Sequence, residues 1–378
     1  MIIQTLMKKL NVIDLFSGCG GSALGFRNEG YQISVAVDID KVASESFKIN
    51  FPEAFVFSED ISTLTGKQLL QAAGIKSGKD VLIIACPPCQ GFSSARRKSE
   101  RMSDPRNKLI YEFLRIVKEI KPAVFVMENV PGLAKGIGKP LFDDILEDLQ
   151  KSGYQTVHDI VNAADYGVPQ RRKRLLLMGI NKKFGNIGFP DRTNSRVEQQ
   201  NGLKPWMSVR LAIFDLPKIT AGEKSPADLM HTSAHLSETN LKRIQNTPHD
   251  GGSRTSWPEE LVLECHKNSN GYKDVYGRMS WDGPSPTITG GCVMISKGRY
   301  GHPEQDRAIS LREAARLQTF PDSFKFVGNF GNIAKQIGNA VPPLLAERAA
   351  KEIKKVIMKD EKEANSEILS FQEISAIA

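Results

Sequence analysis

The chain has 378 residues, of which 40% are hydrophobic and 25% are charged, and its 51 basic and 43 acidic residues give a net charge of +8. At roughly 150 residues per domain this length predicts two or three domains, the composition excludes wholesale disorder, and no apolar run is long enough for a transmembrane helix. Lys8 and Lys9 follow a short apolar run, the reverse of a signal peptide, and the five cysteines fit free thiols in a reducing compartment. We therefore expect a cytoplasmic protein that does not bind membranes.

Apolar runs of strand length alternate with amphipathic runs of helical length through the first half of the chain. Strands are predicted at 10–16, 33–37, 55–57, 80–86, 123–127 and 174–180. Helices are predicted at 21–29, 40–50, 109–117 and 142–149. This alternation predicts an α/β fold with a mostly parallel, doubly wound sheet.

A different pattern begins near residue 189. From there to about residue 286 the sequence is rich in Gly, Pro, Asn, Ser and His and has weak periodicity, which predicts a smaller, loop-rich inserted domain. Helices return at 310–317, where Ser310 is the expected cap, and at 343–358. The predicted domains are a first domain over 1–188, an inserted domain over 189–332, and the completion of the first domain over 333–378.

A glycine-rich turn follows the first predicted strand. It reads Asp14-Leu-Phe-Ser-Gly18-Cys-Gly20-Gly21, and Asp38 follows 20 positions after Gly18, at the end of the second strand. The glycines let the backbone approach a ligand closely, and the carboxylate can accept hydrogen bonds from both ribose hydroxyls. The pattern predicts a site for a ligand with an adenosine end; a purely structural turn is the alternative.

Two cysteines follow the strand predicted at 80–86, in the segment ACPPCQGFS. Cys86 ends the strand and is expected to be a buried structural residue, whereas Cys89 lies beyond the strand, as a presented nucleophile would. A zinc site would need two more ligands, and the adjacent Cys265 and His266 are an awkward pair. We therefore expect no metal at these cysteines.

Two further polar groups come at strand ends. Glu128 ends an apolar strand, where partial burial favours the protonated carboxyl of a general acid, although a solvated carboxylate would fit as well. Four of the five residues from Gln170 to Arg174 are basic. Strand geometry places Arg172 and Arg174 on one face, where two guanidiniums suit a phosphate or a polar ring oxygen; a solvated charge run is the alternative.

In this order the motifs resemble those of bacterial DNA (cytosine-5) methyltransferases. DLFSGCGG, PPCQGFS, MENVPG and YGVPQRRKR are followed, after a variable stretch, by PSPTITGG, SLREAARLQTFPDSF and KQIGNAVPP. The likeness covers residues 11–180 and 285–349. It implies a Rossmann-like methyltransferase domain with an inserted target-recognition domain, which methylates cytosine C5 in a specific duplex DNA sequence with S-adenosylmethionine as cofactor.

The resemblance also implies how the reaction proceeds. Cys89 would add to C6 of the cytosine, and Glu128 would hold the base edge and protonate N3. Arg174, together with Arg172, would hold the ring oxygen and the thiolate region. Because a ring carbon inside a stacked duplex is out of reach, the base must flip out of the helix into the site.

The residues implied in cofactor binding are Phe16, Gly18, Gly20, Asp38, Ile39, Asp60, Ile61, Pro88 and Asn339. Within this set Asp38 would bind the ribose, and Ile39 would pack on adenine, where the family often has an aromatic residue. Asp60 with Ile61 would hold the adenine amine and ring, and Asn339 would close the pocket.

The residues implied in DNA binding are Gln90, Ser93, Arg96, Arg97 and Gln170. The segment from Gly91 to Lys108 carries six basic and two acidic residues, as expected of a loop that closes over phosphates. Sequence choice would come from residues 190–281, and Arg312 and Arg316 would support that domain structurally. We expect a monomer that acts on double-stranded DNA beside a separately acting restriction endonuclease; an orphan regulatory enzyme is equally compatible.

Three alternatives stay open. An NAD-dependent oxidoreductase would explain the glycine turn and Asp38, but not the PPCQ, ENV and QRRKR motifs. A catalytically silent DNA-binding protein would explain the charge, yet Cys89 and Glu128 are both present. An RNA-methylating branch of the family would share the motifs, and the roughly hundred-residue insert favours duplex DNA only weakly.

Overall fold

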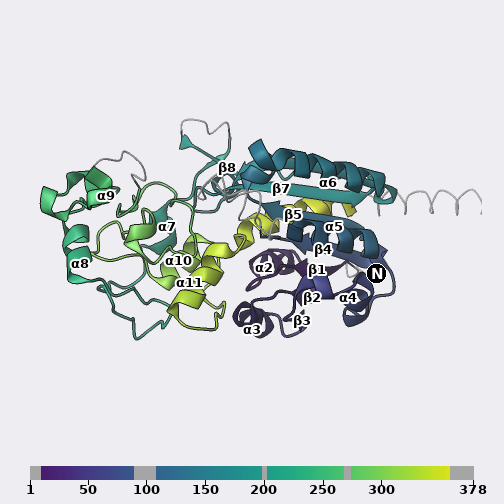
Figure 1. Ribbon diagram of the computed structural model, residues 1–378, viewed down its shortest axis with the longest axis horizontal. Helices are drawn as coiled ribbons and strands as arrows, with labels where there is room; N and C mark the ends of the chain where they lie inside the picture. Colours follow the sequence, from purple (N-terminus) through teal and green to yellow (C-terminus); the bar gives the residue numbers. More distant parts are fainter. Residues whose placement is uncertain (1–9, 89–107, 198–201, 268–273, 358–378) are drawn as a thin grey trace, which may run out of the picture. The chain divides into compact units, whose positions relative to one another are not determined.

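A computed structural model describes residues 10–88, 108–197, 202–267 and 274–357 (Figure 1). The chain divides into two compact units: unit 1 comprises residues 1–161, 173–191 and 345–378, and unit 2 comprises residues 162–172 and 192–344. The insertion therefore begins close to the expected residue 189, but unit 2 also takes in 162–172 and 333–344, which the sequence had placed in the first domain. In the described part of the chain no helix is long and apolar enough to cross a membrane.

A seven-stranded sheet is the centre of unit 1, and it confirms the predicted α/β class. Its strands are β1 (Asn11–Leu15), β2 (Gln32–Val37), β3 (Phe55–Phe57), β4 (Val81–Ala85), β5 (Val124–Asn129), β6 (Tyr154–Asn162) and β7 (Lys173–Asn181). Their order is β3-β2-β1-β4-β5-β7-β6. The strands β1 to β5 pair in parallel, whereas β7 runs antiparallel to β5, so the sheet is mixed. Because five strands run parallel, their carboxyl ends meet at one edge, where ligands bind in open α/β sheets.

The helices of unit 1 begin and end close to the positions that the sequence predicts. They are α2 (Gly21–Asn28), α3 (Lys41–Asn50), α4 (Gly66–Ala72), α5 (Leu109–Ile120) and α6 (Lys139–Lys151), and residues 343–357 form a last helix. Asp40 caps α3 by accepting hydrogen bonds from the amides of Val42 and Ala43. The short α4 was not predicted, although Thr65 and Gln68 form a capping box at its start.

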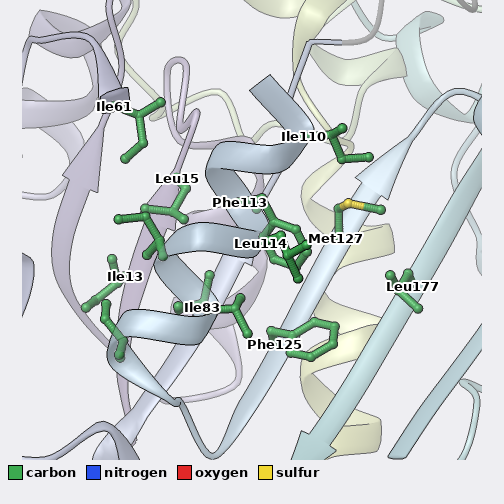
Figure 2. Packing of buried hydrophobic residues seen from close by; sticks show 14 of the residues in the cluster. Ile13, Leu15, Ile61, Ile83, Ile110, Phe113, Leu114, Phe125, Met127 and Leu177 are labelled. Carbon is green, nitrogen blue, oxygen red and sulfur yellow. The ribbon is translucent and has the colours of Figure 1, made fainter. Parts of the chain in front are cut away.

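Both faces of the sheet are buried, as expected of a mainly parallel sheet. On one face a continuous apolar cluster joins the strands to α4, α5 and α6, and Leu15, Phe113 and Met127 belong to it (Figure 2). Val12 and Leu82, which have the opposite parity and are partners in the β1–β4 register, are buried on the other face. This burial gives the polar residues at the strand ends a rigid support.

Unit 2 has short elements and its own small core, in line with the loop-rich sequence. Its elements are β8 (Asn194–Ser195), β9 (Lys204–Pro205), α7 (Val209–Ile213), α8 (Glu238–Gln245), α9 (Glu264–Lys267), α10 (Leu311–Leu317) and α11 (Phe330–Asn339). Trp257, Tyr276 and Ile244 belong to its apolar core. Ser310 caps α10 in a capping box with Glu313, which confirms the predicted start of that helix.

Candidate active site

The glycine-rich turn after β1 is held in a conformation that only some residues tolerate. Phe16, Gly18 and Gly20 have φ angles of 59°, 53° and 98°. A Cβ atom on Gly20 would lie 2.5 Å from Cε2 of Phe51, so a side chain does not fit there. At Gly18 a Cβ atom would meet no atom of the described chain within 4 Å. The turn therefore leaves open space beside its backbone, as a ligand cradle requires.

Asp38 links the second strand to this turn. Its Oδ2 accepts a hydrogen bond from the amide of Gly18 at 2.7 Å, and its Oδ1 accepts one from the amide of Asp40 at 2.7 Å. The spacing of 20 residues therefore brings the two sequence features into direct contact. Ile39, the next residue, is 67% exposed, which is unusual for an aliphatic side chain at a sheet edge.

Asp14 is a residue of this edge to which the sequence reading gave no role. It belongs to β1 and is completely buried, and neither carboxyl oxygen has a hydrogen-bond partner among the described residues. Burial raises the pKa of Asp14 well above its ordinary value, and the negative charge of Asp38 raises it further. An acidic residue inside an otherwise apolar strand, NVIDL, was the signal that could have identified it.

The turn after β3 contains the predicted adenine-binding pair. Asp60 caps the short 3₁₀ helix η2 (Ile61–Thr63), because its Oδ1 accepts a hydrogen bond from the amide of Ser62 at 2.9 Å. The side chain of Ile61 is buried in the apolar cluster shown in Figure 2. Contacts of this turn with a ligand therefore fall to the Asp60 carboxylate and to the backbone.

Glu128 and Arg174 form an ion pair at the end of β5. Glu128 lies opposite Leu176 in the antiparallel β5–β7 register, so Arg174 is its diagonal neighbour on the same face. Arg174 Nε lies 2.9 Å from Glu128 Oε1, and the side chains of Arg174 and Glu128 are only 16% and 12% exposed. Removing two charges from water costs free energy, and their mutual attraction offsets that cost only when the geometry is good and further hydrogen bonds are made.

Asn129 connects the same strand end to the segment that leads to the predicted nucleophile. Its Nδ2 donates to the carbonyl oxygen of Pro87 at 3.0 Å, and its Oδ1 accepts from the amide of Val130 at 2.8 Å. Pro88, the next residue, is partly buried. Asn129 was not among the predicted site residues, although its place in the ENV motif beside Glu128 could have drawn attention to it.

Cys86 has the properties of a structural thiol. Its Sγ lies 3.4 Å from the hydroxyl oxygen of Ser22. Burial raises the pKa of Cys86 well above its ordinary value, and the charges of Glu128 and Asp14 raise it further. Because only the thiolate is a strong nucleophile, a raised pKa disfavours Cys86 as the attacking thiol.

Gln170 and Arg172 both lie buried within unit 2. The amide nitrogen of Gln170 donates to Gln318 Oε1 at 2.7 Å, and its amide oxygen accepts from the backbone of Ile288 at 2.8 Å. The DNA contact expected of Gln170 stays a prediction. The guanidinium of Arg172 donates to the carbonyl oxygens of Ile288, Gly338 and Ala340 at 2.9, 3.3 and 3.1 Å. Strand alternation had suggested a shared role with Arg174, but Arg172 precedes β7 and binds backbone.

Asn339 lies in the turn that Arg172 holds. It is the last residue of α11 and its side chain is exposed, whereas the carbonyl oxygens on either side of it, those of Gly338 and Ala340, are bound. Gln318 donates to the carbonyl oxygen of Ala340 as well, at 3.2 Å. The backbone around Asn339 is therefore fixed while its side chain stays accessible.

The remaining predicted residues, Cys89, Gln90, Ser93, Arg96 and Arg97, lie outside the residues that the structure describes. Their roles stay predictions. Elsewhere, in the parts of the chain that are described, no group of three or more His, Cys, Asp or Glu side chains is arranged to hold a metal ion.

Comparison with known proteins identifies the family. Residues 10–355 match the family of C-5 cytosine-specific DNA methylases. The type II methylase M.HgiDII of Herpetosiphon aurantiacus is 38% identical over 352 residues, which cover 92% of this chain and 95% of that protein. The type II methyltransferase M1.HphI of Haemophilus parahaemolyticus is 37% identical over 348 residues, covering 92% and 87%. A solved structure of a prophage-encoded Escherichia coli protein has a TM-score of 0.71 and 26% identity, over 92% of this chain and 99% of that one. This chain therefore belongs to the C-5 cytosine-specific DNA methylase family.

Proposed function

We propose that this DNA (cytosine-5-)-methyltransferase uses S-adenosylmethionine to methylate cytosine in a specific duplex DNA sequence, as the modification enzyme of a type II restriction-modification system. The relatives named type II methylases support the biological setting. The observation that carries the chemistry is the buried Glu128–Arg174 pair, next to the Asn129 that holds Pro87. In this setting the protein acts in the cytoplasm as a monomer, and its endonuclease partner acts separately.

The residues of unit 1 fit S-adenosylmethionine. The cofactor carries positive charge on its sulfonium and ammonium groups, and the buried Asp14 carboxyl has no partner among the described residues that would compete for such a cation. The open backbone at Gly18 gives room for the ligand, Asp38 stands where a ribose-binding carboxylate belongs, and the exposed Ile39 offers an apolar surface for adenine. When bound, the cofactor supplies an electrophilic methyl group.

The protein's own residues supply the activation of cytosine. The Cys89 thiolate forms a bond to C6, and Glu128 delivers a proton to N3, so the electron pair of the broken double bond becomes available at C5. Arg174 keeps the Glu128 carboxyl oriented and neutralises charge on the base oxygen. After methylation a base such as water removes the C5 proton, the C5–C6 double bond re-forms and expels the Cys89 thiolate, and N3 returns its proton to Glu128, which restores the aromatic ring.

We assign Arg172 a positioning role in place of a catalytic one. Its guanidinium fixes the carbonyl oxygens on both sides of Asn339, the residue expected to close the cofactor pocket. Gln170 supports the same region through Gln318. In this proposal unit 2 reads the DNA sequence, and the basic segment 91–108 binds phosphates.

Transfer of a labelled methyl group from S-adenosylmethionine tests this function. The full chain is incubated with duplex DNA of mixed sequence or with RNA, and the modified nucleosides are identified after digestion. We expect 5-methylcytosine from the duplex alone. Label in RNA alone would move the substrate class to RNA, and label on an exocyclic amine would contradict the C5 mechanism.

A further inference from the structure

Arg115, in the middle of α5, uses its side chain to bind a distant turn. Its Nη2 donates to the carbonyl oxygens of Ile61 at 3.0 Å and Leu64 at 2.9 Å, which lie 54 and 51 positions earlier in the chain. Its Nε donates to Glu112 at 2.8 Å and its Nη1 donates to Glu119 at 2.8 Å. The guanidinium thus donates to two carboxylates of its own helix and, at the same time, to two carbonyl oxygens of the turn after β3.

Apolar packing also holds the same turn. The side chains of Ile61 and Leu64 are buried in the cluster that contains Phe113 of α5 (Figure 2). Glu119 adds a further bond, because its Oε2 accepts from the amide of Gly66 at 2.6 Å. The turn over residues 61–66 is therefore attached to helix α5 by both polar and apolar contacts.

We propose that Arg115 is a positioning residue that sets the selectivity of the cofactor site for adenine. The inference rests on the proposed function and on the expectation that Asp60 receives the adenine amine. The Asp60 carboxylate is tied to the turn through the amide of Ser62, so a shift of the turn displaces the carboxylate. Arg115 itself does not need to touch the cofactor; it acts through the carbonyl oxygens of Ile61 and Leu64.

The geometry of this contact requires arginine. A planar guanidinium can donate to two carbonyls and two carboxylates at once, whereas a lysine ammonium is a single point charge with three donors. Arg115→Met removes all four hydrogen bonds of the guanidinium. Arg115→Lys keeps the positive charge but not the planar group with several donors. Glu112→Gln is the matched control, because it removes one ion pair and leaves both carbonyl contacts in place.

The experiment compares the cofactor product with its inosine analogue, in which the Watson–Crick edge of adenine is changed: a carbonyl replaces the 6-amine and N1 carries a proton. Binding of S-adenosylhomocysteine and of S-inosylhomocysteine, in which a carbonyl replaces the amine, is measured by calorimetry on the full chain. We expect the wild type and Glu112→Gln to prefer the adenosyl ligand by about tenfold or more. In Arg115→Met the dissociation constant for the adenosyl ligand should rise by about tenfold, and the preference should fall to within about threefold. Arg115→Lys should lie between.

Three results would overturn the inference. An Arg115→Met protein that melts at a lower temperature yet keeps the wild-type preference would show that Arg115 only stabilises the fold. A wild type that binds both ligands equally would remove the selectivity that Arg115 is proposed to set. A wild type that binds neither ligand would overturn the proposed cofactor, and this inference with it, so the two failures are distinguishable.

Discussion

Each unit contains a fully buried carboxyl side chain, and the surroundings shift the pKa values of the two carboxyls in opposite directions. Burial raises the pKa of Glu313 in unit 2, but the charge and hydrogen bonds of Arg307 outweigh burial and bring that pKa to about 2. Arg307 binds both oxygens of Glu313 at 2.7 Å. In unit 1 burial also raises the pKa of Asp14, and there the nearby charge of Asp38 adds to the rise.

The two carboxyls illustrate a difference in how buried polar side chains are paired in the two units. In unit 2 several buried groups find partners within the chain: Gln170 and Arg172 bind backbone and side-chain oxygens, and Arg278 donates to the carbonyl oxygens of Ile244 and Thr247. Such networks hold together a domain with little regular secondary structure. In unit 1 the Asp14 carboxyl, which has no hydrogen-bond partner among the described residues, stands at the edge where a cationic ligand is proposed to bind. A buried carboxyl of this kind calls for an explanation, and a bound cation is the one that we propose.

The largest effect should come from Glu128→Gln, which keeps the shape of the side chain but removes its carboxyl group. We expect kcat to fall by about 10²- to 10⁴-fold, the usual contribution of a general acid, while the melting temperature changes little. Steady-state methylation and a thermal melt measure the two quantities. Unchanged kcat would remove Glu128 from the chemistry.

Breaking the buried Arg307–Glu313 ion pair of unit 2 should lower stability instead of kcat. Arg307→Met should cost about 3–5 kcal/mol of unfolding free energy, because it leaves the Glu313 carboxylate buried and uncompensated. Replacing both residues by apolar ones should cost less than this single change. Urea titrations of the single and double variants measure these values, and equal costs would contradict the account.

Glu313 should also make stability depend on pH. Its pKa is lowered in the folded state from an ordinary value of 4.5 to about 2, so it contributes stability that is complete above pH 4.5 and is lost as the pH falls towards 2. In the Arg307→Met protein this acid-sensitive part should shrink. Urea titrations across that range give the slope.

Asp14→Asn should lower the affinity for S-adenosylmethionine but should not lower the stability of the protein. The pKa of Asp14 is raised in the folded state, so the stability linked to it is present below the ordinary value of 3.8 and is lost as the pH rises through the folded-state pKa. Asparagine has no such titration, and Asp14→Asn should therefore be at least as stable as the wild type at neutral pH. Affinity for S-adenosylmethionine should fall about tenfold to a hundredfold, because a charge-assisted contact is lost.

The pH dependence of cofactor binding by the wild type shows whether the cofactor binds the ionised form of Asp14. If a cofactor cation binds ionised Asp14, the wild type should bind more tightly as the pH rises and release a proton on binding. Calorimetry in buffers of different ionisation enthalpy detects that proton. Equal affinity of wild type and Asp14→Asn at every pH would leave Asp14 without a role in binding.

The smallest effect concerns Gln170. Gln170→Ala should cost about 1–3 kcal/mol of stability, because it leaves buried partners of the amide unpaired, and it should not change the salt dependence of DNA binding.

Arg96→Gln, at a predicted phosphate contact, should lower by about one the slope of log affinity for DNA against log salt concentration, and it should leave stability unchanged. A salt slope that changes with Gln170 would restore its predicted DNA contact.

The sequence predicts most of unit 1 because its strands are apolar and its turns carry glycine, proline or an acid. β6 escaped prediction because it is a half-exposed edge strand with few apolar residues, and α4 is too short to show a helical period. The buried hydrogen bonds of Gln170 and Arg172 could not be predicted for a different reason. Charge and strand parity show which residues can bind an anion or a carbonyl, but not which carbonyls the folded chain brings within reach.

The central claim is that Cys89 attacks cytosine while Glu128 assists, and duplex DNA that contains 5-fluorocytosine tests it most directly. Methyl transfer onto that base leaves no C5 proton to remove, so the thiol adduct cannot break down. With S-adenosylmethionine present we predict a protein–DNA band that survives denaturation, is lost in Cys89→Ser and forms more slowly in Glu128→Gln. The absence of an adduct from a protein that binds the cofactor, or an adduct that persists in Cys89→Ser, would contradict the account.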